Sequence, residues 1–147
     1  MIVIVIIGIL ATIAIMGFSG VQAKGRDTER ESDARSVVSQ LEVYFNEQGT
    51  YPIASTMANT TASTIAGGSG ILKGLAADAL VNPLASSGAT NSIVAAAASG
   101  SPSTSVYWYQ SYAANGSTVC SATPCPKFKF LYTKEQGGTT VTLNSIN

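Results

Sequence analysis

The sequence opens with MIVIVIIGILATIAIMGFSGVQA over residues 1–23, a stretch without an ionisable side chain. A helix rises 1.5 Å per residue, so this stretch would extend about 35 Å, enough to cross a hydrocarbon core of about 30 Å. A cleaved secretory signal normally begins with basic residues, but none precedes Ile2, and the apolar run leads directly into a helical pattern. We therefore expect a retained transmembrane helix.

Three glycines set this stretch apart from a plain membrane anchor. Gly8, Gly17 and Gly20 lie among isoleucines and valines, although each glycine costs a helix about 1 kcal/mol. Small residues allow helices to approach one another closely in an apolar medium. Chance glycines in a single anchor remain one interpretation. The other is a helix that first lies in lipid and later packs against copies of itself.

Charged residues are concentrated immediately after the apolar stretch. Residues 24–47 carry ten of the sixteen charges, whereas residues 48–126 carry only Lys73 and Asp78. Helical spacing places opposite charges side by side. The expected pairs are Arg26–Glu29, Asp27–Arg30, Arg30–Asp33 and Glu31–Arg35. This pattern is typical of a solvated helix face, and it also allows pairing with an offset copy of the same band.

The second half of the helix has one apolar face that we expect to pack on a sheet. Its members recur every three or four residues, as in an amphipathic helix. They are Val37, Val38, Leu41, Tyr44 and Phe45. Gly49 and Pro52 predict the end of the helix, and no proline interrupts the chain before them. The sequence thus predicts one helix of about 47 residues, near 70 Å long.

Residues 49–105 form a connecting region rich in Ala, Ser, Thr and Gly. Two modest helices are predicted there, near Ile71–Leu80 and Asn91–Ser99, and the remainder reads as a long surface connection. Asn59-Thr60-Thr61 in this region and Asn115-Gly116-Ser117 beyond it match the N-glycosylation pattern. Asn59 and Asn115 are therefore possible glycosylation sites.

The last third of the chain, residues 106–147, predicts strands. Val106–Tyr112 is rich in aromatic residues, Lys127–Thr133 alternates apolar and polar residues, and Thr139–Leu143 is β-branched. Three consecutive strands indicate an antiparallel meander, whose apolar face needs a cover. The fold class is therefore α+β: a long N-terminal helix, apolar over residues 1–23, packs its 24–48 half on a small antiparallel sheet, within a globular domain of residues 24–147.

Cys120 and Cys125 lie between the first two predicted strands. In a segment exported across a membrane, two cysteines this close together predict a disulfide. A redox-active pair is disfavoured because the spacing is not Cys-x-x-Cys. Export would also place the C-terminal part outside the cytoplasm.

Composition excludes several classes of function. There is no histidine, so histidine-based catalysis and histidine metal sites are excluded. Two cysteines cannot form a four-ligand zinc site, and residues 79–134 contain no carboxylate for calcium. The formal net charge of zero argues against a broad nucleic-acid surface. We expect neither an enzyme nor a metal or cofactor site, and no nucleic acid bound by an obvious motif.

These features together resemble the type IV pilins and their pseudopilin relatives. The stretch Ile2–Ile15 is similar to the family's N-terminal hydrophobic helix, and later residues are similar to pilins of Gram-positive and related bacteria. Those later residues are Arg26-Asp27, Arg30, Ser32-Asp33, Leu41, Tyr44-Phe45, Gly49 and Tyr51-Pro52. The match covers residues 1–52 well and the remainder only in outline.

The resemblance implies the structural subunit, or major pilin, of a type IV pilus. Such subunits wait in the cytoplasmic membrane and are assembled by a prepilin peptidase, a platform protein and an ATPase into an extracellular helical homopolymer. The filament serves adhesion, twitching motility or DNA uptake. The residues implied in helix packing at the filament core are Ile2, Val3, Ile4, Val5, Ile6, Ile7, Gly8, Ile9, Leu10, Ile13 and Ile15. The alternatives are a pseudopilin of a type II-like secretion system and a singly anchored surface binding protein.

The sequence departs from the family pattern in three places. The family's basic leader and its helix glutamate have no counterpart from Met1 onward, so we assign the glutamate's role to no residue. Many bacterial pilins have proline at the position of Met16, where it accompanies local unwinding. Without that proline, we expect the Gly8–Met16 stretch to remain helical in the filament. The expected disulfide loop is also smaller than is usual in the family.

Overall fold

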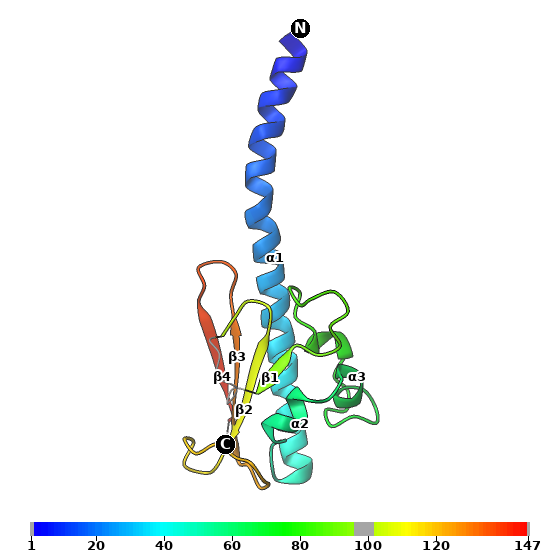
Figure 1. The fold of residues 1–147 in the computed structure, drawn as a ribbon, viewed down its shortest axis with the longest axis vertical. Helices are drawn as coiled ribbons and strands as arrows, with labels where there is room; N and C mark the ends of the chain where they lie inside the picture. The colour runs from blue at the N-terminus through cyan, green and yellow to red at the C-terminus, as the bar shows by residue number, and fades with distance from the viewer. Residues whose placement is uncertain (1, 96–101, 147) are drawn as a thin grey trace.

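The structure, a computed structural model, describes residues 2–95 and 102–146, without the side chains of residues 14–17 and 19. Helix α1 (Ile2–Gln48) spans 47 residues and dominates the shape. Its N-terminal half projects alone beyond the remainder of the chain, and its C-terminal half lies against the sheet (Figure 1). The helix is unbroken across Gly8–Met16. It ends where predicted, because Gly49 adopts a φ of 69°, a left-handed conformation that favours glycine.

The sheet has four strands in the order β1-β2-β3-β4. Strands β2 (Tyr107–Tyr112), β3 (Lys127–Thr133) and β4 (Thr140–Asn144) form the predicted antiparallel meander. The prediction of a purely antiparallel sheet was wrong, because β1 (Ile93–Ala95) adds to β2 in parallel. The fold class α+β is confirmed, with a mixed sheet.

Strand β1 replaces part of the helix predicted over Asn91–Ser99. Ile93 is 3% exposed and pairs with Tyr107 of β2. The Asn91 side chain fixes the start of the strand, since its Oδ1 accepts the N–H of Ile93 at 2.9 Å. Burial against the neighbouring strand therefore outweighs the local helix preference of the alanines. Residues 96–99 of that predicted helix lie outside the described residues.

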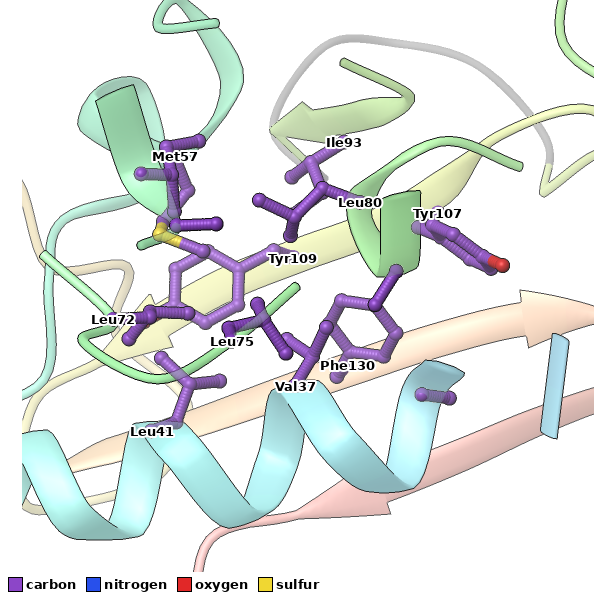
Figure 2. Close-up of a cluster of buried hydrophobic side chains, with 14 of the residues drawn as sticks. Val37, Leu41, Met57, Leu72, Leu75, Leu80, Ile93, Tyr107, Tyr109 and Phe130 are labelled. Atoms are coloured by element: carbon purple, nitrogen blue, oxygen red, sulfur yellow. The ribbon is translucent and has the colours of Figure 1, made fainter. Parts of the chain in front are cut away.

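The core lies between the C-terminal half of α1 and the inner face of the sheet. Val37 and Leu41 have no exposed surface, and they point from α1 toward Tyr109 and Phe130 (Figure 2). The other three residues of the predicted packing face are partly buried against the same cluster: Val38, Tyr44 and Phe45. Alternation in β3 places Phe128, Phe130 and Tyr132 inward, as their spacing indicates.

The connecting region closes the end of this core with short elements. Helices α2 (Ala54–Ala58) and α3 (Ala62–Ile65) were not predicted. The helix predicted over Ile71–Leu80 was wrong except for a single 3-10 turn, η1 (Ala77–Leu80). Gly74 has a φ of 91°, which an α-helix does not allow, and Leu72 forms a bridge with Ala66 instead.

The disulfide between Cys120 and Cys125 is confirmed. Its S–S distance is 2.03 Å, and it lies in the connection between β2 and β3. Next to it, the N–H of Cys125 donates to Thr50 Oγ1 at 2.7 Å, and the N–H of Tyr51 donates to the Cys125 carbonyl at 2.8 Å. The bridged loop is thereby tied to the end of α1.

Candidate functional site

The first candidate feature is the apolar half of α1, residues 2–23, which we call the apolar rod. Its described large apolar side chains are each more than half exposed: Ile2, Val3, Ile4, Val5, Ile6, Ile7, Ile9, Leu10, Ile13, Phe18 and Val21. Monomeric soluble proteins rarely expose contiguous apolar patches larger than a few hundred Å². The rod therefore favours contact with another apolar surface over exposure to water.

The sequence predicts a transmembrane helix over residues 1–23. Among the residues that the structure describes, no helix is both long and apolar enough to span a bilayer. Ile15, predicted to pack in a filament core, has its side chain outside the described residues.

Gly8 sits on the rod with open space around it. A Cβ built there would meet no heavy atom within 4 Å beyond the helix's own backbone. Thr12 Oγ1 donates to the Gly8 carbonyl at 2.8 Å, a bond within the helix. The subunit itself therefore does not require glycine at this position. Close approach of a neighbouring helix and a chance glycine both stay predictions.

The second candidate feature is a cluster at the base of the rod, made of Arg26, Asp27, Arg30, Asn82 and Glu135, which we call the charged collar. Arg30 is fully buried and its Nη1 donates to Asp27 Oδ1 at 2.6 Å. Its Nε donates to Asn82 Oδ1 at 3.4 Å, and its Nη2 lies 3.6 Å from Glu135 Oε2. Three segments distant in sequence therefore meet on one guanidinium.

The collar holds the β3–β4 turn against α1. Arg26 donates to both carboxylate oxygens of Glu135, at 2.9 and 2.6 Å. Asp27 accepts the backbone N–H groups of Glu135 and Gln136, at 2.8 and 3.0 Å. Gln136 Nε2 also donates to the Gly20 carbonyl at 3.0 Å, and the turn reaches up beside the helix (Figure 1). The globular domain thus contacts the helix at the C-terminal end of the apolar rod.

The electrostatics of the collar favour its ionised form. Burial alone would raise the pKa of Asp27, but the N–H groups of Gln136 and Glu135 and the charge of Arg30 outweigh burial and lower that pKa. The Arg26 hydrogen bonds lower the pKa of Glu135. Both carboxylates are therefore held as anions that bind the turn to the helix.

Only part of the predicted charge pairing is observed. Asp27–Arg30 and Glu31–Arg35 form as expected. The predicted Arg26–Glu29 and Arg30–Asp33 pairs do not form, because Glu135 takes the side chain of Arg26 and Asp33 turns toward the sheet. Arg30 is the cation that is fully removed from water, and Asp27 of the same helix is its closest partner. Arg26, whose side chain is 29% exposed, pairs with Glu135 of the turn.

Sequence reasoning missed Glu135 and Asn82, which belong to the collar, and Gln136, whose N–H donates to Asp27. One signal was available, since Glu135 is the only acidic residue after Asp78. A lone carboxylate beside a predicted turn is a natural partner for the positive charges of the helix. Which of those charges it would meet depends on how far the turn reaches along the helix.

Asp33 lies at the edge of an open groove of about 530 Å³ between α1 and residues 74–79. Tyr107 donates its hydroxyl to Asp33 Oδ2 at 3.1 Å. Burial raises the pKa of Asp33, and the nearby charges of Glu29 and Asp78 add to the effect. Within the described chain, no group of three or more His, Cys, Asp or Glu side chains could hold a metal ion.

The two predicted glycosylation asparagines lie on exposed surface. Asn59 caps the C-terminus of α2, and Asn115 lies in the β2–β3 connection. Asn115 Oδ1 accepts the N–H groups of Ser117 and Thr118, and its Nδ2 donates to Thr118 Oγ1 at 2.7 Å. Glycosylation at either position stays a prediction.

Comparisons of the chain with protein-family models, with curated proteins and with solved structures found no match in any of the three.

Proposed function

We propose that this chain is the major structural subunit of a type IV pilus-like filament. The observation that carries the proposal is the apolar rod, a helical surface of large apolar side chains that the subunit leaves exposed. In a filament, the rods of many subunits would pack together and remove this surface from water. The globular domains would then face outward.

The charged collar supports the same proposal. Rods can bundle regularly only if each globular domain keeps a defined position relative to its rod. The contacts of Arg26 and Asp27 with the β3–β4 turn, and of Gln136 with Gly20, provide that rigid junction. Head-to-tail repetition of one contact generates an open helical fibre.

The direct test is electron microscopy of material sheared from the native cell surface, with mass spectrometry of the enriched proteins. We expect long thin fibres dominated by this chain. If the chain remains with the membrane fraction and no fibre contains it, the major-pilin proposal is wrong. A pseudopilin or a singly anchored surface binding protein would then be favoured. Fractionation also tests the expected cytoplasmic-membrane pool.

A variant of the rod sharpens this test. Ile9 is 58% exposed, so Ile9→Lys should not disturb the subunit itself. In a bundle of rods the lysine would be an unpaired buried charge, which costs several kcal/mol. We expect Ile9→Lys to abolish fibres while the subunit accumulates normally. Ser87→Lys, on an exposed loop of the globular domain, is the matched control. Fibres of Ile9→Lys at wild-type abundance would contradict the proposal.

A further inference from the structure

The outer edge of the sheet is formed by β4, the outermost strand on the left of Figure 1. β4 pairs with β3 on one side, and no other strand of the described chain pairs with it. An unpaired edge presents backbone N–H and C=O groups to any chain that can align with it.

The register shows which backbone groups point outward. The N–H of Lys134 donates to the Thr139 carbonyl, and the N–H of Ser145 donates to the Phe128 carbonyl. In an antiparallel ladder, bonded residues alternate with unbonded ones. The backbones of Val141 and Leu143 therefore face β3. Those of Thr140, Thr142 and Asn144 face the open edge.

This edge lacks two of the features that normally prevent pairing, charged side chains and proline. Natural edge strands are protected by lysine, proline, bulges or a covering segment. From Gln136 to Asn147 the sequence is QGGTTVTLNSIN, which contains neither a charged residue nor proline. The exposed side chains of β4 are Thr140, Thr142 and Asn144, all small and uncharged. The strand is therefore suited to add another strand.

We propose that β4 is a self-association edge, at which two copies of this chain pair antiparallel about a two-fold axis through Thr142. In this register Thr142 lies opposite Thr142 of the second copy, and Thr140 lies opposite Asn144. Every outward-facing backbone group of β4 then has a partner. The half-buried Val141 and Leu143 lie opposite each other across the axis and extend the apolar inner face.

The second copy is the occupant that fits best because the edge is self-complementary. The pairing brings no like charges together, and threonine and asparagine can meet on the outer face. A two-fold contact closes on itself, so it cannot build a head-to-tail fibre. It would instead join subunits of neighbouring filaments. As a contact between filaments, the β4 pairing rests on the proposed function, although two copies can pair without forming filaments.

Disulfide crosslinking of the full-length chain in detergent solution tests the register. Both native cysteines are already paired, so an introduced thiol is the only free one. Opposed residues have Cα atoms about 5.5 Å apart, within disulfide range. Asn144 and its own copy would be about 14 Å apart, beyond that range. We expect Thr142→Cys to yield about tenfold more crosslinked dimer than Asn144→Cys or the exposed-loop control Ser87→Cys.

The outcomes are distinct. Thr142→Cys crosslinking no better than Ser87→Cys would overturn the proposal. So would crosslinking at Asn144→Cys in its place, or crosslinking of Thr142→Cys to a different protein.

Thr142→Lys places two like charges on the axis, and we expect it to weaken dimerisation at least about tenfold, whereas Ser87→Lys should not. Sheared fibres of Thr142→Lys should remain intact but separate from one another. Loss of bundling with fibres retained supports the edge, whereas dimers without fibres would contradict only the proposed filament function.

Discussion

Asp27→Ala is the substitution that most directly tests the charged collar. It removes the carboxylate that accepts Arg30 at 2.6 Å and two backbone N–H groups of the β3–β4 turn. Asp27 is 8% exposed and Arg30 is fully buried. The substitution therefore leaves a guanidinium without its closest anion and releases the turn from the helix.

The expected loss follows from these contacts. Removing one partner of a buried ion pair typically costs 3–5 kcal/mol, because the other charge stays buried. Glu135 Oε2 lies 3.6 Å from Arg30 Nη2 and offsets part of that cost, so the lower end applies. We expect the free energy of unfolding to fall by about 3 kcal/mol. For a domain of this size that corresponds to a fall in Tm of roughly 12 °C.

Tryptophan fluorescence provides the assay. Trp108 is the only tryptophan and lies 8% exposed in β2, so its emission reports unfolding of the sheet and not of the rod. Glu31→Ala is the matched control, because both partners of Glu31 are exposed: the side chain of Arg35 is 71% exposed and that of Lys134, 3.8 Å away, is 37% exposed. An exposed pair of this kind contributes about 0.5 kcal/mol or less, so its Tm should change by roughly 2 °C or less.

A second substitution separates the ion pair from general damage. Adding Arg30→Met to Asp27→Ala removes the unpaired buried cation, and part of the lost stability should return. If Asp27→Ala lowers Tm no more than Glu31→Ala, or if the double variant is as unstable as the two losses added together, the collar does not act as argued.

Three further outcomes are expected. In the folded state Asp27 and Glu135 have pKa values below their ordinary values of 3.8 and 4.5. The stability that these carboxylates contribute is therefore complete above the ordinary pKa values and is lost as the pH falls through the folded-state pKa values. Acid titration of the fluorescence should show that unfolding begins below about pH 4. Reduction of Cys120–Cys125 should lower the free energy of unfolding by about 2 kcal/mol, measured by urea titration with and without reductant, and an unchanged midpoint would contradict it. Gly49→Ala should cost about 1 kcal/mol because its φ of 69° disfavours a side chain, whereas Gly8→Ala, with open space around it, should not destabilise the subunit.

The long helix was predictable because its signals are local. The apolar run of residues 1–23 and the spacing of Val37 and Leu41 indicate helix without reference to any other segment. Gly49 ends it through its own backbone freedom. The strands β2, β3 and β4 were equally visible, since alternation and β-branched residues lie within each strand.

The connecting region resisted prediction because its side chains carry little local information. Alanine and serine are compatible with helix, turn and strand alike. Asn91–Ser99 reads as helix by composition, yet Ile93 joins the sheet because β2 offers a parallel partner there. Ile71–Leu80 fails as a helix because Gly74 bends the chain and Leu72 pairs with Ala66.

The sequence by itself determined the long helix with its apolar half, the antiparallel meander and the disulfide, because periodicity, apolar content and close spacing act over short distances along the chain. Only the tertiary structure decided that Arg30 is buried, that Glu135 closes the collar and that β4 is left as an open edge. Each of these depends on which distant segments meet. Electrostatic and backbone pairing energies arise only once the core has placed those segments side by side.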